Sequence, residues 1–113
     1  RRRAIANQYS TKITHPDVIC PLEMNESNVA HLYVVRTKNR ESLREFLLQQ
    51  GIATDIHYPI PDYLQSAFQD LQVDVALPNT LLLSKEVLTL PCYPELSDGQ
   101  VNYVIDTINS WKK

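Results

Sequence analysis

The residues best suited to chemistry are His57 and Tyr58, which stand together in the segment GIATDIHYPIPDYLQ. We expect them where a strand ends and a loop begins, because ligand contacts in α/β folds concentrate at such positions. Pro59 and Pro61 fix φ at two positions, so less entropy is lost when this loop is ordered. A rigid loop that presents an imidazole and a phenol suits a polar ligand such as a sugar or a phosphate. The alternative is a surface histidine at His57 and a core residue at Tyr58.

Two further residues are candidates for the same ligand. His31 begins the first clear strand of the sequence, although it can equally be a simple strand-edge residue. Tyr63 follows the start of the next predicted helix and points away from its apolar stripe, so it can line the same rim. The predicted substrate-binding residues are therefore His57, Tyr58, Tyr63 and His31.

No complete catalytic set is visible in the sequence. Ser84 has no evident base, and the two cysteines lack a CxxC partner and metal-ligand spacing, so we expect buried thiols. A lysine that forms a Schiff base needs a desolvated or cation-rich pocket, whereas every lysine here is in a polar or terminal setting. We therefore predict no catalytic residue, no metal site and no cofactor bound by this chain alone. The lysines are Lys12, Lys38, Lys85, Lys112 and Lys113.

Two strands are expected to carry the candidate residues. HLYVVRT at 31–37 is rich in β-branched and aromatic residues, and Ile52–Tyr58 alternates in the same way. If the second strand is regular, His57 and Tyr58 point to opposite sides of the sheet. Shorter strands are predicted at Val18–Cys20 and from Leu88 onward.

Helical patterns surround these strands. They are predicted from the chain start to at least Tyr9, from a cap at Asn39 to Gly51, from Pro61 with a stripe at Leu64, Ala67, Phe68 and Leu71, and from a cap at Asn79 to about Val87. The abrupt start at Arg1 suggests a helix that is longer in a parent protein.

The last helix is the best specified element of the sequence. Ser97 and Gln100 form a capping box, with Leu96 and Val101 at the positions of a hydrophobic staple. The elements together predict one domain over 1–113, a small α/β (α+β) fold with a sheet of about three strands covered by helices. The apolar face of the last helix comprises Val101, Val104, Ile105, Ile108 and Trp111.

Composition excludes several classes of protein. The formal net charge of −2 argues against a general nucleic-acid binder, which is usually basic. Two glycines among 113 residues leave no Gly-rich phosphate loop. No apolar run approaches the roughly 20 residues of a membrane span, and no signal peptide opens the sequence, so we expect a cytoplasmic protein without membrane contact.

Two segments, GIATDIHYPIPDYLQSAF and LPNTLLLSKEVLTLPCYPELSDGQV, carry a family resemblance. They resemble the C-terminal small domain of the DegT/StrS family of sugar aminotransferases, which use pyridoxal phosphate. One departure is Tyr63, where the family often has histidine. The family pattern GI-x-T-x-x-HYP-x-P-x-x-x-Q is matched by Gly51, Ile52, Thr54, His57, Tyr58, Pro59, Pro61 and Gln65.

The resemblance implies a division of labour between two domains. Residues 1–14 would be the end of an interdomain helix, and 15–113 the small domain of the aspartate-aminotransferase-type fold. The parent enzyme would bind pyridoxal phosphate in its large domain and move an amino group, usually from glutamate, to a nucleotide-linked keto sugar. His57 and Tyr58 would contact the sugar. The family implies a homodimeric parent, whereas the isolated chain can be monomeric.

Two other interpretations stay open at this point. The first is a stand-alone α/β module that binds a ligand or regulates without catalysis, since the chain has a core and a terminal helix of its own. The second is a parent with the same fold that acts as a dehydratase or as a non-catalytic regulator.

Overall fold

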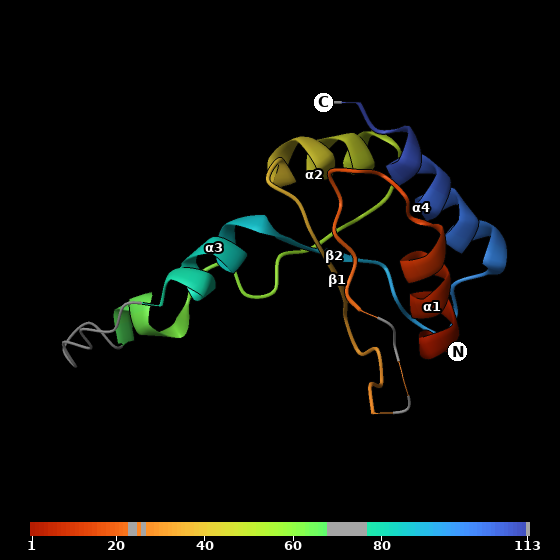
Figure 1. Cartoon of the computed structure of the whole chain (residues 1–113). Coiled ribbons are helices and arrows are strands. Elements are labelled where there is room, and N and C mark those ends of the chain that lie inside the picture. The colour runs from red at the N-terminus through yellow and green to blue at the C-terminus, as the bar shows by residue number, and fades with distance from the viewer. Residues whose placement is uncertain (23–24, 26, 68–76, 113) are drawn as a thin grey trace.

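The computed structural model describes residues 1–22, 25, 27–67 and 77–112 of the chain. Figure 1 shows α1, α2 and α4 gathered around the two strands, whereas η1 and α3 project to one side. The elements in chain order are α1 (Arg2–Lys12), β1 (Tyr33–Arg36), α2 (Arg40–Gln49), the 3₁₀ turn η1 (Asp62–Leu64), α3 (Pro78–Glu86), β2 (Val87–Leu90) and α4 (Asp98–Ser110).

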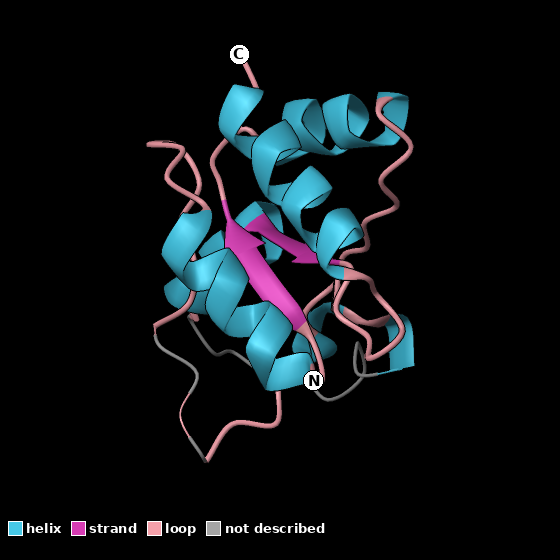
Figure 2. Ribbon diagram, turned by 90° about the vertical axis from the view of Figure 1, so that its right-hand side faces the viewer, coloured by secondary structure: helices cyan, strands magenta, loops and turns pink. Residues whose placement is uncertain are grey.

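The sheet is small and antiparallel (Figure 2). β1 pairs with β2 so that Tyr33 lies opposite Leu90 and Arg36 lies opposite Val87. One isolated bridge extends the sheet at each edge, through Ile19 beside β1 and through Asp55 beside β2. The mixed helix and sheet fold expected from the sequence is confirmed, with two strands in the described residues.

The core lies between one face of the sheet and the three gathered helices. Tyr33 and Val35 alternate inward on β1, and Leu88 and Leu90 do so on β2. The ring of Tyr9 on α1 lies 5.0 Å from that of Tyr33, which ties the first helix to the sheet. The strand and helix periods bring the apolar residues of each element to one side. Removing this apolar surface from water is the main source of stability.

The predicted cap of α4 is confirmed. The Ser97 hydroxyl accepts a hydrogen bond from the Gln100 amide at 3.2 Å, and the Ser97 amide donates to the Gln100 side-chain oxygen at 2.9 Å. These reciprocal bonds satisfy two amides that the helix itself leaves without partners. The predicted apolar face is buried as well, from Val101 to Trp111.

Replacing Ser97 by alanine is expected to lower the free energy of unfolding by about 1 kcal/mol, the usual loss for an N-cap oxygen. Ser97→Asp keeps an acceptor at the same place and should unfold close to the unmodified chain. Urea denaturation followed by circular dichroism measures both variants. Equal midpoints for Ser97→Ala and the unmodified chain would contradict an energetic role for the cap.

The predicted strand Ile52–Tyr58 is wrong. Only Asp55 pairs with β2, through reciprocal backbone bonds with Thr89 of 2.7 and 3.2 Å. The next amide, that of Ile56, instead donates to the Asp55 carboxylate at 2.7 Å. In an antiparallel pair the next bonds to β2 would come from His57, and its backbone makes none among the described residues, so the ladder ends after one bridge. The shorter strand predicted at Val18–Cys20 is likewise one bridge, at Ile19.

The predicted helix boundaries agree only in part with those of the structure. Gly51 follows α2 with φ of 74°, the left-handed conformation predicted for it. Asn39 precedes α2 but its side chain makes no capping bond. α3 begins at Pro78 rather than after a cap at Asn79, because proline at the first helical position needs no amide partner. The helix predicted from Pro61 is a single 3₁₀ turn among the described residues, and Phe68 and Leu71 lie outside them.

Candidate functional site

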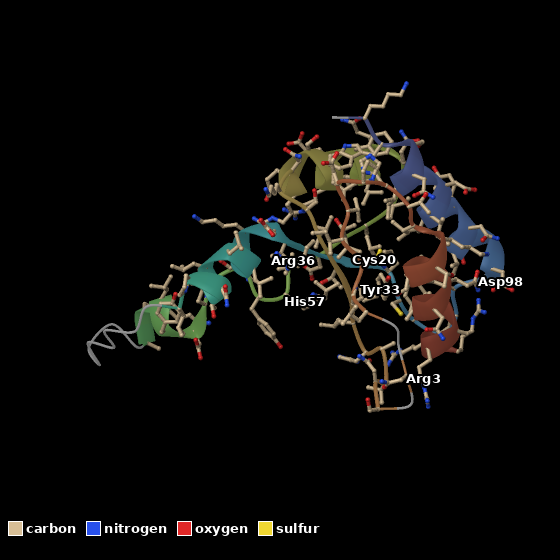
Figure 3. All side chains as sticks on the ribbon, viewed as in Figure 1. Arg3, Cys20, Tyr33, Arg36, His57 and Asp98 are labelled. Atoms are coloured by element: carbon tan, nitrogen blue, oxygen red, sulfur yellow. The ribbon has the colours of Figure 1, made fainter. Side chains whose placement is uncertain are left out.

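Residues 58–67 and 77–86, which include η1 and α3, form a projecting arm (Figure 1). An open pocket of about 620 Å³ lies where this arm meets the body of the molecule. One wall is the segment from His57 to Gln65, and the other is α3 with the first residue of β2. Figure 3 shows His57 at this junction, below the ribbon of α3. The lining residues are His57, Tyr58, Ile60, Pro61, Asp62, Gln65, Thr80, Leu83, Ser84 and Val87.

His57 is fixed by contacts with two side chains. Its Nδ1 atom lies 2.9 Å from the hydroxyl of Thr89, and its Nε2 atom lies 3.7 Å from a carboxylate oxygen of Asp55. Thr89 is the bridge partner of Asp55, and the two contacts of the ring place His57 on the same side of the chain as both. The imidazole is therefore held at the pocket edge and is neither a loose surface group nor a core residue.

Tyr58 lies beside His57 and extends into solvent, with 77% of its surface exposed. The two rings meet edge to face with their centroids 6.2 Å apart, and the peptide bond between the residues is cis. The expectation that they point to opposite sides is wrong, because this segment forms a single bridge and no regular pleat. A core position for Tyr58 is also excluded by its exposure. Both rings line the same pocket.

The structure does not bring the other two predicted residues to this pocket. Tyr63 is half-buried in η1, and its hydroxyl is buried without a hydrogen-bond partner in the described part of the chain. His31 is exposed and precedes Tyr33, which pairs with Leu90 at the end of β2 remote from Val87. Their roles in substrate binding stay predictions.

Thr89 is the site residue that the sequence reasoning missed. It is the one polar residue in the strand VLTL, and it faces away from the core side that Leu88 and Leu90 occupy. Only 7% of its surface is exposed, and its hydroxyl reaches His57. A lone threonine between inward-facing leucines was the signal that could have identified it.

The α3 wall is anchored to the sheet at its C-terminal end. Arg36 makes an ion pair with the Glu86 carboxylate at 2.8 Å, and Arg40 donates to the Ser84 carbonyl at 2.5 Å. The Thr37 amide also donates to the Glu86 carbonyl at 3.0 Å. Arg40 thereby satisfies a carbonyl in the last turn of α3, where positive charge is favourable. These contacts give both arginines a structural role, although the buried Nε of Arg36 has no hydrogen-bond partner in the described part of the chain.

The described side chains do not suit a covalent cofactor or a reactive thiol. Four lysines are exposed and none lines the pocket, so a Schiff base with pyridoxal phosphate has no partner in the described residues. Burial raises the pKa of both the Cys20 and the Cys92 thiol, which keeps them protonated and weakly nucleophilic. Within the described ranges, no cluster of three His, Cys, Asp or Glu side chains could hold a metal ion.

A helix must be long and apolar to span a membrane, and none of the helices in the described residues meets both conditions.

Known proteins resemble this chain over nearly its whole length. It is 37% identical to a dTDP-3-amino-3,6-dideoxy-alpha-D-galactopyranose transaminase of Aneurinibacillus thermoaerophilus, over 98% of this chain and 31% of that protein. It is 40% identical to a pleiotropic regulatory protein of Geobacillus stearothermophilus, over 80% of this chain and 25% of that protein. The chain thus spans about a third or less of these relatives.

Solved structures show the same fold. The crystal structure of DesV from S. venezuelae, in complex with a ketimine intermediate, superposes with a TM-score of 0.90 at 34% identity, over 98% of this chain and 31% of that one. NtdA from Bacillus subtilis, with the cofactor PMP bound, gives a TM-score of 0.84 at 25% identity, over 95% and 26%. The profile of the DegT/DnrJ/EryC1/StrS aminotransferase family matches residues 1–109. The chain is a member of this aminotransferase family.

Proposed function

We propose that this chain is the C-terminal small domain of an aminotransferase that uses pyridoxal phosphate and acts on a nucleotide-linked keto sugar. Residues 1–14 would end the interdomain helix, and 15–113 would form the domain. The observation that carries the proposal is a pocket with a polar histidine and tyrosine edge but no lysine in its described walls. Such a wall can bind a substrate, whereas the chemistry of the amino group needs a second wall.

The proposal assigns binding and orientation to this chain. His57 and Tyr58 would contact hydroxyl or oxo groups of the sugar, and the apolar side chains of Ile60 and Leu83 would exclude water around it. When bound, pyridoxal phosphate supplies an electron sink for the carbanion chemistry. The lysine that holds it and the groups that bind its phosphate would belong to the large domain of the parent.

Partner and location follow from the same assignment. The projecting arm exposes apolar residues that isolated domains seldom leave in water, which supports contact with a large domain. We also propose a homodimeric parent. Cys20 and Cys92 are free thiols, in keeping with a reducing compartment such as the cytoplasm. The exposed apolar residues of the arm are Tyr58, Ile60, Leu64, Leu77, Leu81, Leu82 and Leu83.

A regulator with the same fold is the second candidate. The similarity to a pleiotropic regulatory protein favours it, because that relative is 40% identical over 80% of this chain, whereas the transaminase is 37% identical over 98%. Both candidates keep the pocket, but they differ in whether the parent processes an amino group.

The absorption spectrum of the intact parent protein with pyridoxal phosphate separates the two candidates. An aminotransferase should show a visible band of bound cofactor that glutamate bleaches, because glutamate gives its amino group to the cofactor. The 113-residue chain alone should show no such band, since its described lysines are exposed and outside the pocket. A parent without the band would overturn the aminotransferase assignment and leave the regulator.

A further inference from the structure

We propose that Thr89 is a positioning residue that holds the neutral His57 ring as the Nε2–H tautomer. The ring then offers a hydrogen-bond donor, rather than a base, to an oxygen atom of the sugar. This second statement rests on the proposed function, whereas the tautomer itself does not. The inference assigns a role to a buried hydroxyl and fixes the direction of the contact that His57 makes.

The geometry places three polar side chains on one face of the sheet. Asp55 lies opposite Thr89 in the bridge, and His57, two residues later, is the diagonal neighbour of Thr89. Thr89 is buried at 7% exposure, so a hydroxyl without a partner would be costly there. Its contact with His57 Nδ1, at 2.9 Å, is of ordinary hydrogen-bond length.

The direction of that hydrogen bond follows from the groups around the ring. A threonine hydroxyl can donate or accept, but the Asp55 carboxylate can only accept. If Nδ1 carried the proton, the lone pair of Nε2 would face the carboxylate oxygen 3.7 Å away, which is repulsive. If the Thr89 hydroxyl donates to Nδ1, the hydrogen on Nε2 faces Asp55 and both contacts are favourable. The second arrangement is therefore the stable one for a neutral ring.

The position of Nε2 determines what it can recognise. Asp55 is largely exposed and lies beyond hydrogen-bond distance of Nε2, so the hydrogen remains available to a ligand. His57 lines the pocket, and a donor at its edge matches a carbonyl, hydroxyl or phosphate oxygen. A base that removes a proton would instead need a free lone pair on the exposed nitrogen.

The chain has three histidines, and the two other than His57 serve as internal references for a test. His15 accepts a hydrogen bond at Nδ1 from the Asp17 amide at 3.1 Å, and its Nε2 lies 3.0 Å from the Trp111 carbonyl. An amide can only donate and a carbonyl can only accept, so His15 is a fixed Nε2–H ring. His31 is exposed and serves as the reference for a ring in water.

The test is a long-range ¹H–¹⁵N correlation spectrum of the 113-residue chain at neutral pH, which distinguishes protonated from unprotonated ring nitrogens. The His57 signals should match the fixed pattern of His15. In Thr89→Val, which keeps the branched shape but loses the hydroxyl, they should move to the pattern of His31. Thr89→Ser should restore the fixed pattern.

A His57 ring that is doubly protonated, or protonated at Nδ1, in the unmodified chain would overturn the proposal without any variant. An unchanged His57 pattern in a folded Thr89→Val chain would do the same. In the intact parent, Thr89→Val should lower kcat/KM by about tenfold, with Thr89→Ser close to normal. If the tautomer changes as expected but turnover does not, the inference about Thr89 stands and the sugar contact assigned to His57 fails.

Discussion

Replacing Trp111 by alanine is expected to lower the free energy of unfolding by about 3 to 5 kcal/mol, the range for deleting a buried aromatic residue. The indole is 3% exposed and its ring centroid lies 5.1 Å from that of His15. It thereby closes the core between the end of α4 and the segment that follows α1. Removing it leaves a cavity that neighbouring side chains fill only in part, which is why the loss exceeds that of a surface change.

Trp111→Phe separates packing from hydrogen bonding. The indole nitrogen has no hydrogen-bond partner within the described residues, so phenylalanine loses no polar contact and should cost clearly less than alanine. Lys112→Ala, at the exposed neighbouring position, is the matched control and should be close to neutral. Urea denaturation of the three variants provides the comparison. A Trp111→Ala chain as stable as the control would show that α4 packs differently.

The second large effect concerns turnover. His57→Ala in the intact parent should lower kcat/KM by about tenfold to a hundredfold, which corresponds to the loss of one directed hydrogen bond of roughly 1–3 kcal/mol. The affinity for pyridoxal phosphate should stay nearly unchanged, because the cofactor groups are assigned to the large domain. Steady-state kinetics with the keto sugar and titration with the cofactor measure the two quantities separately.

The control for His57→Ala is Asp106→Asn on the exposed side of α4, which should leave both quantities unchanged. If His57→Ala abolished cofactor binding, the residue would belong to the cofactor site and the assigned role would be wrong. Unchanged kcat/KM with the sugar would equally contradict contact with the substrate.

The parts of the fold that the sequence predicted correctly are those with local causes. The cap at Ser97 depends on residues three positions apart, and the left-handed turn at Gly51 depends on one residue. The failed strand from Ile52 to Tyr58 depends on pairing with β2, far along the chain, and that pairing forms only at Asp55. A period of two in the sequence carries no information about how many residues pair with a distant strand.

The residues of the pocket, like the fold, were predictable only where the cause is local in the sequence. His57 and Tyr58 were singled out from their residue types and the two prolines beside them, and both line the pocket, whereas their contact with a substrate stays a prediction. Thr89 was missed because its role exists only once the Asp55 bridge forms, and the opposite wall depends on how α3 is placed. His31 was grouped with the others from residue type alone, and the register of β1 on β2 sets it apart.

The junction of α3 with β2 also determines how the pocket can adapt to ligands of different size. The helix ends at Glu86 and the strand begins at Val87, so no linker separates them. Moving α3 outward would break its contacts with Arg36, Thr37 and Arg40. The facing segment around Pro59 and Pro61 has restricted φ angles and makes no comparable set of contacts with the sheet after His57 in the described residues. The α3 wall is therefore the fixed side of the pocket, and any widening of the pocket would have to come from the facing segment.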